Sequence, residues 1–317
     1  MKAAVALSAL FASATPAFAA TYLKSESFVG ESFYTGFDFQ AIADPTHGRV
    51  NYVDAQTAKD KNLTYASADT FVLRMDSTTV LDPAGPGRDS VRIRSKNTYT
   101  THAVVVDIRH MPQGCGTWPA IWETNEAAWP AGGEVDILEG VNDVVPNAAT
   151  LHTSPGCTMP ATRDELGTPT QADCDTNVNG NAGCGVKFSD QTSFGPGLNA
   201  QGGGWYAMER TDSFIKVWFW PRGSPNVPIG VSEGHDDVIT ENWGTPQALF
   251  PSDTCNIAEH FNAHNIIINL TLCGDWAGAT FNTDGCSGVC LDVANNNPET
   301  FKDAYFDIAA INVYKAQ

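Results

Sequence analysis

The 317-residue sequence contains few charged residues, and positive charge is the scarcer sign. Charged side chains make up 17% of the chain, against roughly 25% in an average globular protein. Lys and Arg number 18, Asp and Glu number 36, and the formal net charge is −18. This balance repels a phosphate backbone and excludes nucleic acid as a partner.

The sequence also lacks long hydrophobic runs and sustained helical periodicity. Beyond the first twenty residues we find no apolar run long enough for a membrane-spanning helix. Residues 1–19 have the form of a secretory signal peptide, with Lys2, a short apolar run and the cleavage pattern Ala17-Phe18-Ala19. We therefore expect a soluble, secreted protein with no membrane partner. No composition break marks a linker, so residues 20–317 are expected to form one domain.

Eight cysteines lie behind the signal peptide, and their even number predicts up to four disulfides whose pairing the spacing leaves open. No C-x-x-C pair is present, so we expect no metal and no other cofactor. Two Asn-x-Thr sequons occur. Asn62 lies in a polar turn and is expected to carry a glycan, whereas Asn269 lies inside an apolar run and is expected to be inaccessible.

Hydrophobicity alternates with period two along much of the chain. In residues 214–220, Ile215, Val217 and Phe219 share one face of a predicted strand, and Trp218 and Trp220 share the other. Similar strand signals occur at residues 70–75, 91–95, 102–109, 135–141, 148–153, 205–210, 265–272 and 306–314. Only short helical turns are expected, such as 256–261. Many strands separated by turn residues predict an all-β fold, a β-sandwich or jelly roll.

The segment from residue 154 to residue 204 has little periodicity and much Gly, Asn, Thr and Pro. A loop of this length is unusual in a compact domain. Because Cys157, Cys174 and Cys184 can pin it, we interpret it as a stapled functional loop beside a site. Disorder is the alternative.

Residues 133–140 read GEVDILEG and hold three carboxylates, at Glu134, Asp136 and Glu139. On a strand, Glu134 and Asp136 point to the same face because they are two residues apart. Glu139 would point the other way unless one extra residue in a β-bulge, around Ile137 or Leu138, returns it to that face. We therefore predict three acids on one side of a sheet.

Crowded carboxylates push their pKa values apart, leaving one group protonated and another ionised near neutral pH. Glycoside hydrolysis needs such a pair. Trp118, Trp122 and Trp129 precede the acids, and indole rings stack on sugar rings; we expect Trp118 to be largely structural. His152, on the next strand, could lie across from the acids. A solvated acidic strand or a calcium site is the alternative, but calcium prefers a more flexible loop than this apolar run.

GEVDILEG resembles the catalytic signature of glycoside hydrolase family 16, in the form with two residues between Asp and the second Glu. Other segments are similar to the fungal laminarinase branch of that family: ADPTHGRVNYVD, GPGRDSVRIRS, RHMPQGCGTWPAIWET, GGGWYAMER and NLTLCGDWAG. The resemblance implies a β-jelly roll with a substrate cleft across its concave sheet. It also implies an endo-1,3(4)-β-glucanase that hydrolyses laminarin-like β-glucans, with a β-1,3-glucan chain as the partner.

Residue by residue, the resemblance implies Glu134 as the nucleophile, Asp136 as its support and Glu139 as the general acid/base. Glu134 and Glu139 lie on one short strand, so we expect a retaining double displacement. We also expect the protein to be a monomer. The residues implied or considered for substrate binding are Trp122, Trp129, His152, Trp276, Arg94 and Tyr206. For Arg94 and Tyr206 a structural role is an equal alternative.

Three other functions are alternatives to this one. A non-enzymatic β-glucan-binding lectin would keep the Trp residues without needing all three acids. A cell-wall glucan transglycosylase would use the same acids but exclude water. A metalloenzyme built on His260 and His264 has helical metal-ligand spacing but lacks the flanking Glu pattern.

Overall fold

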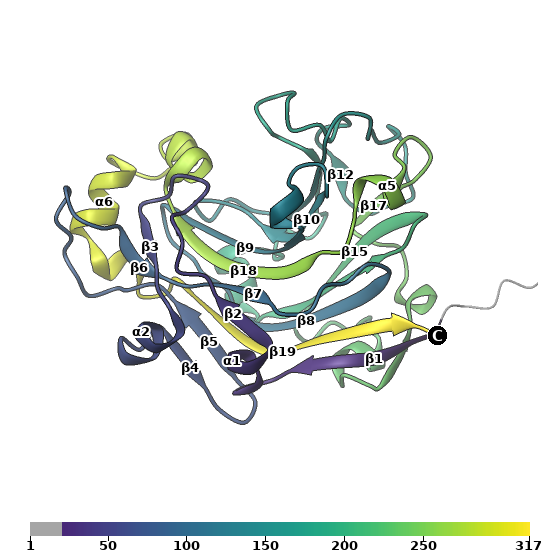
Figure 1. The fold of residues 1–317 in the computed structure, drawn as a ribbon, viewed down its shortest axis with the longest axis horizontal. Coiled ribbons are helices and arrows are strands. Elements are labelled where there is room, and N and C mark those ends of the chain that lie inside the picture. The colour runs from purple at the N-terminus through teal and green to yellow at the C-terminus, as the bar shows by residue number, and fades with distance from the viewer. Residues whose placement is uncertain (1–20) are drawn as a thin grey trace, which may run out of the picture.

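The computed structural model describes residues 21–317, so the expected signal peptide at 1–19 lies outside the described residues. Two antiparallel sheets pack face to face, with the chain's short helices at their edges (Figure 1). Within residues 21–317, no helix is long and apolar enough to cross a membrane. The predicted all-β jelly-roll sandwich is confirmed.

The larger sheet has nine strands, and β1 lies beside β19 in it. Its main path runs through β16 (Asp237–Ile239), β1 (Thr21–Phe28), β19 (Tyr305–Ala316), β8 (His102–His110), β14 (Gly204–Arg210), β15 (Phe214–Pro221) and β17 (Ala248–Pro251). Its remaining strands are β5 (Phe71–Arg74), which pairs with β19, and β4 (Thr64–Ala66), which pairs with β5.

The smaller sheet has eight strands and supports the cleft described below. In spatial order they are β12 (Thr168–Pro169), β13 (Cys184–Lys187), β11 (Ala148–His152), β10 (Glu134–Glu139), β9 (Thr117–Thr124), β18 (Asn265–Leu272), β7 (Arg92–Ser95) and β2 (Phe37–Phe39). A separate parallel pair is formed by β3 (Val50–Tyr52) and β6 (Arg88–Ser90). In Figure 1, β18 curves along its length.

The helices are all short, as the missing helical periodicity predicts. The α-helices are α1 (Ser32–Gly36), α2 (Ala55–Asp60), α3 (Gly195–Ala200), α4 (Ile229–Ser232), α5 (Ile257–His260) and α6 (Cys290–Asn296). The tighter turns are η1 (Glu126–Ala128), η2 (Thr240–Trp243) and η4 (Pro298–Phe301), and η3 (Gly274–Gly278) is a π-helical turn.

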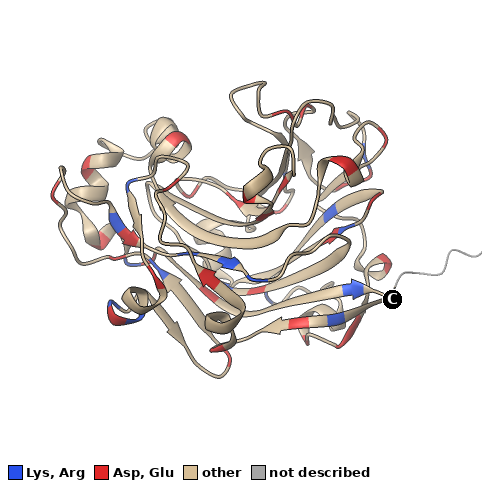
Figure 2. Cartoon of the chain, viewed as in Figure 1, with Lys and Arg blue, Asp and Glu red and all other residues tan. Residues whose placement is uncertain are grey.

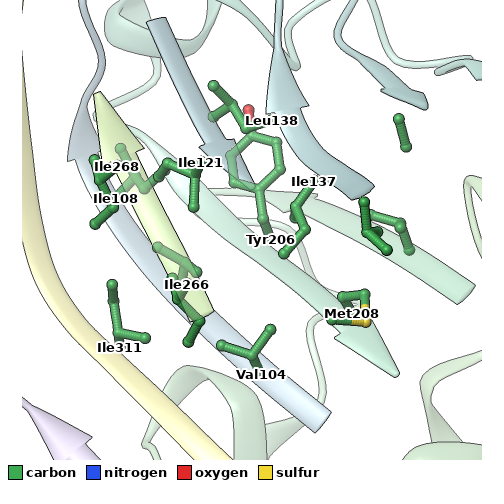
Figure 3. Close-up of a cluster of buried hydrophobic side chains, with 14 of the residues drawn as sticks. Val104, Ile108, Ile121, Ile137, Leu138, Tyr206, Met208, Ile266, Ile268 and Ile311 are labelled. Carbon is green, nitrogen blue, oxygen red and sulfur yellow. The ribbon is translucent and has the colours of Figure 1, made fainter. Parts of the chain in front are cut away.

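The main core lies between the sheets and is built from alternate residues of their strands. Figure 3 shows apolar side chains of β8, β14 and β19 gathered with those of β9, β10 and β18. On β15, Ile215, Val217 and Phe219 belong to this core, as predicted. Trp218 and Trp220, on the opposite face, are buried too, in a second cluster on the outer side of the larger sheet.

Four disulfides connect all eight cysteines: Cys115–Cys286, Cys157–Cys255, Cys174–Cys184 and Cys273–Cys290. Two of them hold the segment from 154 to 204, which contains β12, β13 and α3. The prediction of a stapled loop is confirmed. Asp and Glu residues are spread over many loops and strands, and Lys and Arg are fewer (Figure 2). The net negative charge is therefore not confined to one segment.

Candidate active site

A cleft of about 790 Å³ lies on the outer face of the smaller sheet. Strand alternation supplies its floor. On β9, Trp118 and Trp122 line the cleft while Ile121 between them lies in the core. On β18, Asn269 lines the cleft while its neighbour Ile268 lies in the core. One face of each strand therefore stabilises the sandwich and the other is free to bind a ligand.

The predicted β-bulge in β10 is confirmed. Along β10 the paired residues step from Asp136 to Glu139, while along β11 their partners step only from Thr150 to Ala148. One residue of β10 is therefore extra. Ile137 and Leu138 are both buried in the core, as Figure 3 shows. Glu134, Asp136 and Glu139 consequently all line the cleft.

Two tryptophans hold the outer acids. The indole N–H of Trp129 donates to Oε2 of Glu134 at 2.6 Å, and the indole N–H of Trp118 donates to Oε1 of Glu139 at 2.9 Å. Glu134 and Glu139 are half-buried residues at the floor of the cleft. Each acid thus keeps one oxygen fixed by an indole while the group stays accessible to a ligand.

Asp136 and His152 form the buried centre of the site. Nε2 of His152 lies 3.4 Å from Oδ2 of Asp136, and Nδ1 of His152 lies 2.9 Å from Oδ1 of Asn181. Asp136 is 1% exposed and His152 is 7% exposed. With an oxygen acceptor at each ring nitrogen, His152 is arranged to carry two protons. The expectation that His152 lies across from the acids is confirmed.

Burial and crowding shift the pKa values of these groups. Burial raises the pKa of Glu134 to about 7, and the charge of Asp136 adds to this rise. Burial and Asp136 likewise raise the pKa of Glu139 to about 8. Burial alone would lower the pKa of His152, but its contact with Asp136 and the surrounding carboxylates raise it to about 10. Near neutral pH the site therefore holds a charged imidazolium and a protonated Glu139.

Within residues 21–317, one group of side chains has the arrangement to hold a metal ion. Donor atoms of Glu134, Asp136 and His152 lie within 4.8 Å of one another. A metal would have to displace a proton that His152 retains up to a pKa of about 10. The donor set therefore suits a shared proton better than a metal. His264 does not act as a metal ligand through Nε2, because its Nε2–H donates to the Gly132 carbonyl at 2.6 Å.

The other tryptophans of the site differ in part from expectation. Trp118, expected to be structural, lines the cleft and contacts Trp276 edge-to-face at 5.6 Å between ring centroids. Trp122 lies on β9, and its indole N–H donates to the side-chain oxygen of Asn269. Trp129 follows η1, and both Trp129 and Trp276 line the cleft as expected, 45% and 37% exposed.

Two proposed binding residues do not line the cleft. Tyr206 lies in the core between the sheets, where its hydroxyl donates to the Ser193 carbonyl. Arg94 pairs with Glu126 at 3.0 Å and with Asp38 at 3.8 Å, so it reaches the cleft only through Glu126. Both therefore have structural surroundings. Strand alternation predicts the position of Tyr206, because Tyr206 and the core residue Met208 are two residues apart.

Several residues of the cleft were not predicted, among them Arg92, Asn269 and Asn181. Arg92 lies over the ring of Trp122 at 5.1 Å and pairs with Glu126. Asn269 accepts from Trp122, and its place as a polar residue within the apolar run IIINLTL was a usable signal. Asn181 comes from the stapled loop, and no periodicity there indicates which side chain turns inward.

Comparison with known proteins agrees with this geometry. The model of the XgeA-like, catalytic GH16 domain family matches residues 37–314. The chain is 42% identical over 305 residues to a probable endo-1,3(4)-beta-glucanase of Aspergillus clavatus, covering 93% of this chain and 46% of the relative. It is 38% identical over 305 residues to an endo-1,3(4)-beta-glucanase of Arthroderma benhamiae, covering 93% and 65%. The chain thus spans about half the length of the Aspergillus relative.

Two solved structures have the same arrangement over their whole chains. GH16 Laminarinase 16A from Phanerochaete chrysosporium, solved with 6-O-glucosyl-laminaritriose, is 61% identical with a TM-score of 0.92. An elongating GH family 16 beta-1,3-glucosyltransferase is 36% identical with a TM-score of 0.87. Each covers 93% of this chain, which covers 100% of each. With the family model matching nearly all of the described residues, the chain belongs to glycoside hydrolase family 16, as an XgeA-like catalytic domain.

Proposed function

We propose that this chain is an endo-1,3(4)-β-glucanase that hydrolyses laminarin-like β-glucans with retention of anomeric configuration. The observation that carries the proposal is the bulged strand β10, which places Glu134 and Glu139 on one face of the cleft floor. Two carboxyl groups so close in one strand fit the separation of about 5–5.5 Å that retaining enzymes use, rather than the wider spacing of inverting ones.

In the first step, the Glu134 carboxylate attacks the anomeric carbon and forms a glycosyl ester. Glu139 gives its proton to the glycosidic oxygen as that bond breaks, and the remainder of the glucan leaves as an alcohol. Glu139 suits the acid role because burial and the charge of Asp136 raise its pKa, so that it retains a proton near neutral pH.

In the second step, Glu139 takes a proton from water, which attacks the same carbon and releases Glu134. The charge of His152 lowers the pKa of both glutamates, while the charge of Asp136 raises both. The opposite effects of His152 and Asp136 on these pKa values partly cancel. Glu134 can therefore ionise while Glu139 retains a proton near neutral pH.

The substrate assignment is supported by the aromatic lining and by the relatives. Trp118, Trp122, Trp129 and Trp276 line the cleft beside the acids and offer apolar faces for sugar rings. Relatives named as endo-1,3(4)-beta-glucanases and a laminarinase 61% identical to this chain point to β-1,3-linked glucans.

The direct test is proton NMR of the first sugars released from laminarin. A retaining enzyme produces the β-anomer before mutarotation, and initial release of the α-anomer would contradict double displacement. The Glu134→Gln variant should lose several orders of magnitude in kcat because the nucleophile is absent. Near-normal hydrolysis by that variant would remove Glu134 from the role.

A second arm uses the Glu134→Ser variant with an α-glucosyl fluoride donor. The α-fluoride of this donor takes the position that the glycosyl ester to Glu134 has in the wild type. The variant should therefore form glycosidic bonds while failing to hydrolyse laminarin. Glu139→Gln serves as the matched variant, because it retains the nucleophile and lacks the acid. It should not catalyse this synthesis.

Transfer to a second glucan is the one alternative that a comparison favours, because the 36% identical structure is an elongating β-1,3-glucosyltransferase. Product sizes separate the two activities. Hydrolysis increases reducing ends and shortens the chains, whereas transfer lengthens some chains without new reducing ends. A lectin role would show neither.

We also propose that the protein is secreted as a monomer carrying a glycan at Asn62. Asn62 is exposed, whereas Asn269 is 6% exposed and hydrogen-bonded to Trp122. Secretion agrees with four disulfides and the leader at 1–19. A fungal host should release a chain beginning at Ala20, and Asn62→Gln should remove one glycan mass. Asn269→Gln should remove none.

A further inference from the structure

The β-bulge of β10 deprives two backbone groups of regular ladder partners, and one side chain serves both. The side-chain oxygen of Asn147 accepts the backbone N–H of Glu139 at 3.0 Å. The amide nitrogen of the same side chain donates to the carbonyl of Ile137 at 3.0 Å. These two groups flank Leu138, where the pairing register shifts. Asn147 thus replaces the missing ladder contacts of the bulge.

Asn147 is itself held rigidly. Its backbone N–H donates to the hydroxyl of Ser193 at 3.0 Å, and its carbonyl accepts the N–H of Phe188 at 2.9 Å. The next residue, Ala148, pairs with Glu139 across the sheet. Asn147 is fully buried. Four hydrogen bonds and complete burial give this amide a single orientation.

The Asn147 side chain satisfies both the N–H of Glu139 and the carbonyl of Ile137 because its short amide carries an acceptor and a donor. Ala would leave a buried N–H and a buried carbonyl unpaired, which favours a rearranged bulge. Asp could accept from Glu139 but could not donate to Ile137 when ionised. Because the side chain of Glu139 extends from the residue whose N–H is held, loosening the bulge redirects its carboxyl.

We propose that Asn147 is a positioning residue that aims the carboxyl of Glu139 at the glycosidic oxygen by fixing the β-bulge. The inference rests on the proposed function, in which Glu139 is the general acid/base. Proton donation requires hydrogen-bond reach, so a small displacement of Glu139 costs acid catalysis while the Glu134 nucleophile, at the other end of β10, stays in place.

The test compares two substrates that differ in their need for an acid. Asn147→Ala should lower kcat/KM for laminarin about tenfold to hundredfold, a large share of what general acid catalysis supplies. For 2,4-dinitrophenyl β-laminaribioside, whose leaving group departs without a proton, kcat/KM should fall by no more than about threefold. An equal loss on both substrates would overturn the proposal, as would a folded variant with unchanged laminarin hydrolysis.

Two further variants separate positioning from stability. Asn147→Leu keeps a similar side-chain volume and removes both hydrogen bonds, so it tests the same substrate split if Asn147→Ala does not fold. Asn312→Ala is the matched control. Asn312 is a buried amide on β19 of the larger sheet, and its side-chain oxygen accepts from the hydroxyl of Ser27 on the neighbouring strand β1. The control should lower the melting temperature and leave the ratio of the two kcat/KM values unchanged.

Hydrogen exchange measures the bulge without any activity. In Asn147→Leu, amide exchange within residues 134–139 should speed up under conditions in which the core of β14 remains protected. Unchanged exchange there would overturn the proposal. Wild-type protein that hydrolyses neither substrate would contradict the proposed function instead, and the exchange result would still decide whether Asn147 fixes the bulge.

Discussion

The imidazole Nε2 of His152 lies 3.4 Å from Oδ2 of Asp136, at the centre of the carboxylate row on β10. The positive charge of His152 and the negative charge of Asp136 both act on Glu134 and Glu139. The charge of His152 lowers the pKa of both glutamates, and that of Asp136 raises both. Because the two charges act in opposite directions, the pH–rate profile reports the effect of His152 and of Asp136 on the pKa values of Glu134 and Glu139.

His152→Gln and Asp136→Asn should shift the pH profile in opposite directions. Loss of the His152 charge raises the pKa of both glutamates, so both limbs of kcat/KM for laminarin should move to higher pH, by about one unit. Loss of the Asp136 charge lowers both pKa values, so both limbs should move to lower pH. Asp136→Asn should reduce kcat less than Glu134→Gln does. Shifts in the same direction would contradict the assignment.

Glu139→Gln should stabilise the protein increasingly as pH rises from about 4.5 to about 8. The folded-state pKa of Glu139 is raised to about 8, so the unfolded chain loses this proton at lower pH than the folded protein does. The wild type therefore loses stability across that window, and the variant does not. Differential scanning calorimetry should find a melting-temperature gain near zero at pH 4 that grows to several degrees at pH 8.

The control for that measurement is Glu299→Gln, at an exposed position of η4. It should give no gain that grows with pH. If Glu139→Gln instead gained most at pH 4, the raised pKa of Glu139 would be contradicted.

Trp276→Ala should weaken substrate binding, and Trp243→Ala should weaken folding. Trp276 is 37% exposed in the cleft, so its loss should raise KM for laminarin by the equivalent of about 1–3 kcal/mol with little change in kcat. Trp243 is 5% exposed and packs on Trp218, so its loss should cost about 3–5 kcal/mol of unfolding free energy and leave KM unchanged. Unchanged KM in Trp276→Ala would place its ring outside the bound glucan.

Removing the Cys174–Cys184 disulfide should impair catalysis through Asn181. The two cysteines are ten residues apart and close the segment that brings Asn181 to Nδ1 of His152. Cys174→Ser with Cys184→Ser should cost about 2–3 kcal/mol of stability and lower kcat. If the staple acts through Asn181, adding Asn181→Ala to that double variant should lower kcat little further, although Asn181→Ala alone lowers it. Additive losses would contradict this coupling.

The sequence predicts most of the fold and the central acids because both follow from strand periodicity. The odd spacing of Glu139 from Glu134 is enough to predict a bulge once all three acids must share a face, and the register confirms it. Strand β9 escaped prediction because Pro119 interrupts it, and proline is rare in central strands. The pairing of β9 with β10 begins at Ala120, one residue after Pro119. The missing N–H of Pro119 therefore removes no hydrogen bond to β10.

Residues that act through long-range contacts could not be predicted in this way. With β9 unrecognised, Trp118 lacked the strand context that places it on the same face as Trp122. Asn147 and Asn181 lie outside any periodic pattern, and their partners are set by how turns pack against β10 and β11. Tyr206 shows the converse, since the family resemblance left a cleft role and a structural role equally open, whereas strand alternation places this residue in the core.

The pairing of β1 with β19 brings the two ends of the described chain together, with the Gln317 N–H donating to the Thr21 carbonyl at 3.2 Å. Figure 1 shows these two strands side by side in the sheet that lies away from the cleft. The backbone is therefore almost a closed ring. A short peptide joining residue 317 to residue 21 would complete that ring, and new ends opened in an exposed turn would yield a circular permutant with both sheets intact.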